Sequence, residues 1–129
     1  MPQKNAGALR GATPMIHVPD VRVTAAWYEM IGFAIVETYG DGGQGLSFAI
    51  LSAGETRLML NQGGSATTES RREVDLYVDT DNVDQQFTLL RDRVPVIAEP
   101  GDTDYGMREF IIRDPNGFWI TFGQNRDTV

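Results

Sequence analysis

The chain of 129 residues contains one histidine and no cysteine, which limits the chemistry that it could perform. A Ser-His-Asp triad would have to run through His17, and thiolate metal sites, two-histidine metal sites and cysteine nucleophiles are excluded. As a general base, His17 would need an orienting partner such as Asp75 and a positioned substrate. The sequence offers His17 and Glu73 as catalytic candidates but no partner set for either of them.

A second set of residues has the chemistry of ligand binding. Four aromatic rings could stack on a flat ligand, and a tryptophan offers the best cation–π face; these are Phe48, Tyr77, Phe110 and Trp119. Five more side chains could complete the site, of which the carboxylates could neutralise a cation; these are His17, Arg57, Met59, Glu73 and Asp75. Structural roles remain open for several of them: Trp119 could fill a dimer interface, and the carboxylates could be solvated.

The charge and composition exclude several classes of partner. The formal net charge is −7, from 11 basic and 18 acidic residues, so the clustered basic excess that binds nucleic acid or an anionic membrane is missing. No apolar run approaches the ~20 residues of a membrane span, and residues 1–10 are too polar for a signal peptide. We therefore expect a cytoplasmic protein, with one domain and a conventional core.

An internal repeat must position these residues. Val21, Ala25 and Tyr28 share one face of an expected helix, and the same spacing returns 62 residues later in the second half. The strand pattern of residues 48–51 recurs at the same offset in residues 110–113. Each half is expected to form a strand, a helix and three strands, which predicts an α+β fold of two β-α-β-β-β modules.

The module boundaries follow from the repeat and from turn residues. We expect an N-terminal arm or tail over 1–12 and one domain over 13–129, with module one at 13–61, a linker at 62–72 and module two at 73–124. Asp20 should cap the first helix and Gly32 should end it. The linker residues Arg71 and Arg72 should be solvated. Residues 40–45 spell G-x-G-x-x-G but precede a strand, which favours a hairpin loop over a nucleotide site.

Strand alternation assigns the candidates to faces, because side chains on a strand switch sides at every residue. Ile16, Val18, Leu58, Leu60, Ile120 and Phe122 should pack against the helices. The other face should form a ligand-binding cup lined by Thr13, Met15, His17, Phe48, Arg57, Met59, Asn61, Glu73, Asp75, Tyr77, Trp119 and Thr121. The repeat offset adds Phe110 and Ile112 to this cup.

The sequence motifs within and between the elements of the two modules resemble those of the vicinal oxygen chelate superfamily, the glyoxalase/bleomycin-resistance/dioxygenase fold. Four segments carry the resemblance over residues 13–124: Val18-Pro-Asp20, Trp27-Tyr28 with Ile31-Gly-Phe33, Tyr105-Gly-Met-Arg-Glu-Phe110 and Arg113-Asp-Pro-Asn-Gly117. The resemblance implies that each module curls its mixed sheet into half of a cup, with the helices outside and the ligand inside.

The resemblance also locates the metal-ligand positions that metal-dependent relatives use. They fall on Thr13, Met59, Glu73 and Thr121, of which only Glu73 is a credible ligand, whereas a catalytic metal usually needs about three protein donors. We therefore expect no metal and no other cofactor, and an extradiol dioxygenase is excluded.

The expected function is metal-free binding, by sequestration, of a small, antibiotic-like, aromatic ligand, either neutral or cationic, as in the bleomycin-resistance branch of the family. That branch implies a homodimer. The alternative is a glyoxalase-like lyase or isomerase with a non-standard metal site, so whether the chain is an enzyme stays open.

Overall fold

The chain forms two modules with the same order of elements. The structure is a computed structural model that describes residues 8–40, 45–67 and 69–126. The first module contains β1 (Met15–Val18), α1 (Val21–Met30), β2 (Ala34–Gly40), β3 (Leu46–Ala53) and β4 (Thr56–Gln62). The second contains β5 (Leu76–Asp79), α2 (Val83–Leu90), β6 (Val96–Asp102), β7 (Met107–Arg113) and β8 (Trp119–Asn125). The predicted α+β fold and its paired β-α-β-β-β modules are confirmed.

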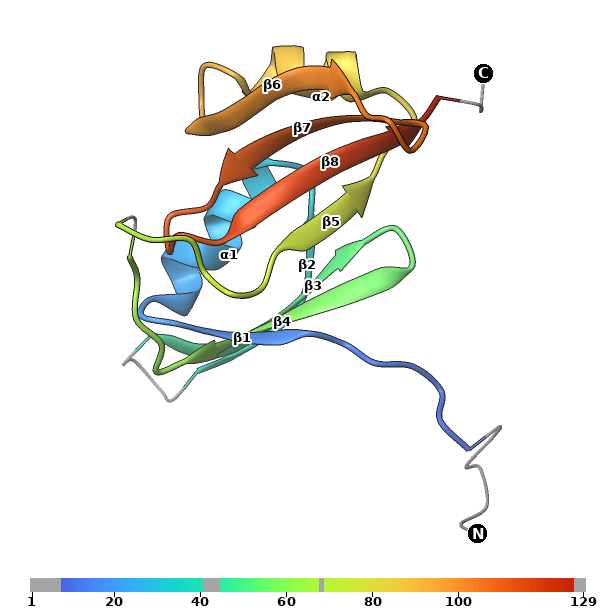
Figure 1. The fold of residues 1–129 in the computed structure, drawn as a ribbon. Coiled ribbons are helices and arrows are strands. Elements are labelled where there is room, and N and C mark those ends of the chain that lie inside the picture. The colour runs from blue at the N-terminus through green and yellow to red at the C-terminus, as the bar shows by residue number, and fades with distance from the viewer. Residues whose placement is uncertain (1–7, 41–44, 68, 127–129) are drawn as a thin grey trace, which may run out of the picture.

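Each module builds one four-stranded mixed sheet. The strand orders are β1-β4-β3-β2 and β5-β8-β7-β6, with the first strand of each module parallel to its last. Helix α1 packs against β2, β3 and β4 of the first sheet, and α2 packs against β6, β7 and β8 of the second sheet, as Figure 1 shows. The middle of the glycine-rich loop (41–44) and the first part of the expected arm (1–7) lie outside the described residues. No helix in the described part of the chain is long and apolar enough to cross a membrane.

Both helices begin at the capping residues of their modules. The Asp20 carboxylate accepts a hydrogen bond from the Val23 amide at 3.0 Å, and the Asn82 side chain accepts one from the Gln85 amide at 3.0 Å. These bonds satisfy amides of the first turn that have no partner within the helix. Gly32 follows α1 with a φ of 120°, a value that favours glycine. The predicted cap and stop of the first helix are therefore confirmed.

The helix-facing sides of β1, β4 and β8 are those that alternation predicts. Ile16, Val18, Leu58, Leu60, Ile120 and Phe122 are all buried in one hydrophobic cluster. In β5 the helix-facing residues Leu76 and Val78 pack against the same cluster, whereas Val74 precedes the strand and is exposed.

The predicted place of Phe110 and Ile112 in the cup is wrong. Both side chains are fully buried on the helix side, and the Phe110 ring stacks on Phe122 with centroids 4.8 Å apart. The cause is the turn length: Ala53 pairs with Thr56 across the first hairpin, while Arg113 pairs with Trp119 across the second. A longer turn shifts β7 by one residue against the repeat, and a one-residue shift exchanges the two faces of a strand.

The modules are joined by buried hydrogen bonds between α1 and the turn that precedes β8. The Tyr28 hydroxyl donates to the Asp114 carboxylate at 2.6 Å, and the Asn116 side-chain amide donates to the Thr24 hydroxyl at 3.0 Å. The linker lies over this turn, since Arg72 donates to the Asn116 carbonyl at 2.9 Å. Its guanidinium also lies 4.3 Å from the centre of the Phe118 ring. The prediction that Arg72 is a solvated linker residue is therefore wrong.

Candidate functional site

The second sheet has one face that its helix does not cover. Strand pairing places Tyr77 and Ile111 on either side of Thr121, with Glu109 opposite Gly123 and Arg113 opposite Trp119. Their side chains alternate with the buried residues Phe110, Ile112, Ile120 and Phe122. We call this surface the open face of the second sheet, and it consists of Tyr77, Asp79, Glu109, Ile111, Arg113, Trp119, Thr121 and Gly123.

A carboxylate between two tyrosines lies at one end of the open face. The Tyr77 hydroxyl donates to one oxygen of Glu109 at 2.7 Å, and the Tyr105 hydroxyl donates to the other at 2.7 Å. The Tyr77 ring passes over Gly123, where a β-carbon would lie 1.9 Å from the hydroxyl oxygen. This position therefore needs a residue without a side chain.

Both tyrosines at this end keep their protons at neutral pH. Desolvation, followed by the hydrogen bond to Glu109, raises the pKa of Tyr77 well above its usual value. For Tyr105, the hydrogen bond to Glu109 is the main reason that its pKa is raised. Neither hydroxyl can act as a base or nucleophile in this state, so this end of the face is suited to binding.

Arginines surround the tryptophan at the other end of the open face. The Arg71 guanidinium lies 4.1 Å from the centre of the Trp119 ring and also forms an ion pair with Asp75. The prediction that Arg71 is solvated therefore missed a contact, because the guanidinium of Arg71 covers one face of the Trp119 ring. Arg113 is the cross-strand neighbour of Trp119, and its buried Nε donates to no acceptor among the described residues.

The corresponding face of the first sheet carries the remaining predicted residues. Met59 lies between Met15 and Ile50, and Asn61 lies between His17 and Phe48. Alternation therefore placed Phe48, Met59 and His17 on the correct side of the sheet. The Phe48 ring packs against Tyr39 with centroids 5.8 Å apart, and His17 is exposed.

A groove of about 980 Å³ runs between the two modules. Among the predicted ligand-binding residues, it brings together Arg57, Asp75 and Tyr77. The other predicted residues do not line it: Phe48, Met59 and His17 lie on the first sheet, Trp119 lies on the second and Phe110 is in the core. Glu73 precedes β5 and is exposed. The structure therefore distributes the predicted site over separate surfaces of one chain.

The four metal-ligand positions implied by the resemblance do not form a donor set. Met59 has Met15 as its neighbour and Thr121 has Tyr77, while Thr13 and Glu73 precede their strands. No group of three or more His, Cys, Asp or Glu side chains that could hold a metal ion occurs among residues 8–40, 45–67 and 69–126. A thioether and hydroxyls are poor ligands for a catalytic divalent metal. The expected absence of a metal remains a prediction.

Comparison with protein families decides the relationship that the modules suggest. The model of the Glyoxalase/Bleomycin resistance protein/Dioxygenase superfamily matches residues 12–122. The chain belongs to this superfamily. No curated protein was found with significant sequence similarity to the chain.

Solved structures with the superfamily's fold cover nearly the whole chain. A bleomycin resistance determinant encoded on the transposon Tn5 is 21% identical, with a TM-score of 0.69, and the match covers 91% of this chain and 98% of that one. The bleomycin-binding protein from bleomycin-producing Streptomyces verticillus, complexed with copper(II)-bleomycin, is 21% identical, with a TM-score of 0.66 and coverage of 91% and 97%. A protein of unknown function from Agrobacterium tumefaciens str. C58 is 25% identical, with a TM-score of 0.74 and coverage of 91% and 94%.

Sequence reasoning missed four residues of the open face and its surroundings: Arg71, Tyr105, Glu109 and Arg113. The last three lie inside the segments that carry the superfamily resemblance, where they served only as markers of the fold. Counting the alternation of β7 backwards from Trp119, with the longer turn, would have placed Glu109 and Arg113 on the open face.

Proposed function

We propose that the chain is a metal-free binding protein that sequesters a small, antibiotic-like aromatic molecule carrying a cationic group. The observation that carries this proposal is the composition of the open face of the second sheet. Trp119 presents a partly exposed ring at one end of this face, and Tyr77 presents an exposed ring at the other end, next to a carboxylate at Glu109 that two protonated tyrosines hold in place. Stacking rings and a fixed anion bind an aromatic cation without chemistry.

The superfamily supports this proposal at the level of the fold. Structures similar to this chain include bleomycin-binding proteins, one of them complexed with copper(II)-bleomycin. At identities of 21% and 22%, these structures support a shared fold only. The aromatic and acidic residues of this chain are the reason that we propose an antibiotic-like ligand for it.

We further propose that the working unit is a homodimer. All seven residues of β2 are exposed, including Ile35, Val36 and Tyr39. A strand with apolar residues exposed on both sides is expected to be covered by another surface. A second copy could also cover the open face of the second sheet and the corresponding face of the first sheet.

The proposal is tested by a thermal-shift screen followed by titration calorimetry of the compounds that stabilise the protein. One plate holds bleomycin-type glycopeptides and other flat cationic aromatics, and a second holds divalent metals with and without EDTA. A ligand at about 100 times its Kd stabilises by roughly 2.7 kcal/mol, which raises the midpoint by several degrees. Shifts by aromatics alone support sequestration, whereas a metal shift that EDTA reverses would favour the lyase or isomerase alternative.

A substitution then connects binding to the site. Trp119→Ala should weaken the binding of any aromatic ligand by tenfold or more, on the order of the 1–3 kcal/mol of one stacked base. Trp27→Phe serves as the control, because Trp27 lies on α1 and packs edge-on against Tyr28. Unchanged affinity in Trp119→Ala would remove the open face of the second sheet from the site.

A further inference from the structure

We infer that the open face of the second sheet selects an amphoteric aromatic ligand, with an acidic group bound at Arg113 and an amine bound at Glu109. The inference rests on the proposed function and specifies its ligand class. It places the cationic group of the ligand at a different position from Glu73 and Asp75, which the sequence favoured. The two ends of this face, at Arg113 and at Glu109, carry opposite charges.

The end of the face at Trp119 is already supplied with positive charge. Arg71 covers one face of the Trp119 ring and pairs with Asp75, so a cationic ligand there would have to displace a cation that is already paired. Arg113 lies across the strand from Trp119, and none of the ion pairs among the described residues includes it.

The buried Nε of Arg113 is a donor that lacks an acceptor. It has no hydrogen-bond partner among the described residues, and an unpaired buried donor is costly. A carboxylate or phosphate accepts two parallel charge-assisted bonds from a guanidinium, which are stronger than bonds to a neutral acceptor, and an ammonium group cannot accept at all. Arg113 as a whole is half-buried, while its Nε is out of reach of solvent, so we place the acidic group of the ligand against the rest of the guanidinium.

The opposite end has an anion that is oriented but not neutralised. Each oxygen of Glu109 accepts one hydrogen bond from a tyrosine hydroxyl, and no ion pair among the described residues includes this carboxylate. A carboxylate oxygen has a second lone pair available, so an ammonium group can still bind to it. The hydroxyl groups of Tyr77 and Tyr105 contact the two oxygens of Glu109, and both tyrosine side chains are exposed.

The two ends are separated by an uncharged stretch of sheet. The four residue steps along β8 from Trp119 to Gly123 span about 13 Å at the rise of a strand. Thr121 and its strand neighbour Ile111 lie between them; Ile111 is half-buried and Thr121 is 8% exposed, and neither carries a charge. An aromatic body lying on this stretch would therefore place its two charged groups on opposite sides, on the order of 10 Å apart.

Three probes with the same ring system test the inference by titration calorimetry at pH 7 and low salt. They are 6-(aminomethyl)-2-naphthoate, which carries both charges, 2-naphthoate, which carries only the acid, and 2-naphthylmethylamine, which carries only the amine. We expect the amphoteric probe to bind at least tenfold more tightly than either of the others.

Two substitutions assign the charges to the two ends. Arg113→Gln should weaken binding of 2-naphthoate and of the amphoteric probe at least fivefold and leave the amine unchanged. Glu109→Gln should weaken binding of the amine and of the amphoteric probe by a similar factor and leave 2-naphthoate unchanged. This crossed pattern would not arise from a general loss of folding.

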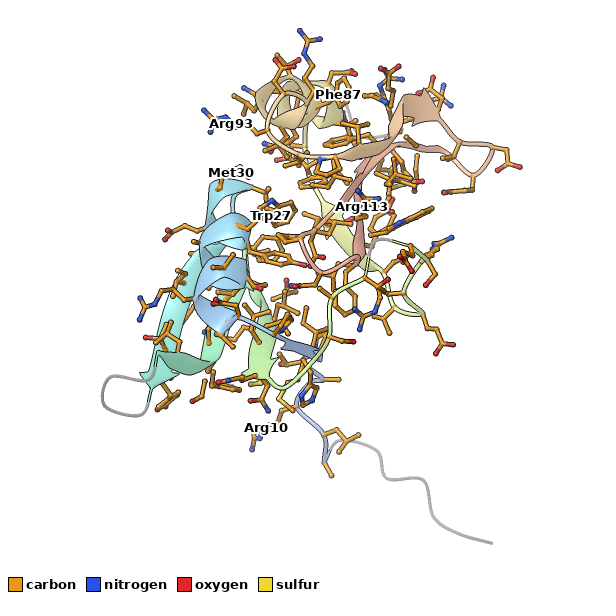
Figure 2. All side chains as sticks on the ribbon, turned by 90° about the vertical axis from the view of Figure 1, so that its left-hand side faces the viewer. Arg10, Trp27, Met30, Phe87, Arg93 and Arg113 are labelled. Atoms are coloured by element: carbon orange, nitrogen blue, oxygen red, sulfur yellow. The ribbon has the colours of Figure 1, made fainter. Side chains whose placement is uncertain are left out.

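Charge-matched variants away from the face control for net charge. Arg93→Gln and Asp92→Asn remove the same charges from exposed residues that follow α2, and Figure 2 shows Arg93 at the outer part of the second module, away from Arg113. Both should leave all three affinities unchanged.

The outcomes separate this inference from the proposed function. Equal affinities for the three probes, or a substitution at either end that weakens all of them alike, would overturn the inference. If flat cationic aromatics bind but the amphoteric probe does not, the inference is wrong and sequestration of aromatic cations stands. If neither class binds, both are wrong.

Discussion

At the scale of single residues, Asp114 connects the two modules. It is 1% exposed and accepts hydrogen bonds from the Tyr28 hydroxyl at 2.6 Å and from the amides of Asn116 and Phe118 at 2.8 and 2.9 Å. Burial raises the pKa of this carboxyl, and the three hydrogen bonds partly offset the effect of burial. A residue that sequence patterns identify as a turn former therefore also holds the domain together.

Tyr28→Phe should lower the free energy of unfolding by about 1.5–3 kcal/mol, because it leaves a buried carboxylate oxygen without its donor. Urea unfolding monitored by circular dichroism measures this change. A change below about 0.5 kcal/mol, within the range of ordinary surface substitutions, would show that the bond contributes little.

The raised pKa of Asp114 gives its contribution to stability a defined sign with pH. Protonation is easier in the folded state, so the contribution is fully present below the ordinary value near 3.8 and is lost as pH rises through the raised value. Relative to Asp114→Asn, the unmodified protein should lose stability as the pH rises from about 3.8 through the raised pKa of Asp114, and then stay level. A relative gain over that interval would contradict the assigned shift.

Gly123→Ala should change the titration of a tyrosine more than the stability of the fold. The new β-carbon would displace the Tyr77 ring, and Tyr77 would lose both its shielding from water and its bond to Glu109. Its pKa should then fall toward the usual value of 10.0. Absorbance titration at 295 nm should show one more tyrosine ionising near that pH, and an unchanged curve would place Tyr77 elsewhere.

At the scale of elements, the linker between the modules is fixed by close backbone contacts. A β-carbon on Gly117 would lie 1.8 Å from the Thr67 carbonyl oxygen, and one on Gly64 would lie 1.9 Å from the His17 carbonyl oxygen. These glycines let the linker lie directly on β1 and on the turn before β8.

Two glycine substitutions separate this packing from backbone conformation. Gly117 and Gly54 both have positive φ, 93° and 60°, but no atom lies within 4 Å of a β-carbon on Gly54. Gly54→Ala should cost about 1 kcal/mol from its φ alone, and Gly117→Ala about 2 kcal/mol or more because the linker must also move. Equal costs in urea unfolding would mean that the linker is not held against the turn.

At the scale of the whole molecule, the homodimer that we propose would cover the exposed strand β2. Light scattering after size exclusion should give a mass about twice 14.3 kDa. Val36→Glu should shift the protein to the monomer, because it places a charge in the exposed apolar strand, whereas Leu89→Glu on the exposed side of α2 should not. A monomer in the unmodified protein would refute the dimer.

Much of the fold could be predicted because it depends on local signals. The cap of α1 at Asp20 and its stop at Gly32 follow from the chemistry of single residues. The residues of β1, β4 and β8 that face the helices follow from alternation within each strand. Phe110 shows where this reasoning ends. The side of β7 on which Phe110 lies depends on the length of the turn between β7 and β8, and the internal repeat does not predict that length.

The sequence by itself determined the two modules, their order of elements and the superfamily, because each of these depends on spacing along the chain. Only the tertiary structure decided which charges meet. Arg71 forms an ion pair with Asp75 and covers one face of Trp119. Glu109 accepts hydrogen bonds from Tyr77 and Tyr105, and the Nε of Arg113 has no acceptor among the described residues. Most of these contacts join different strands and loops, and one residue of register is enough to exchange one set of partners for another.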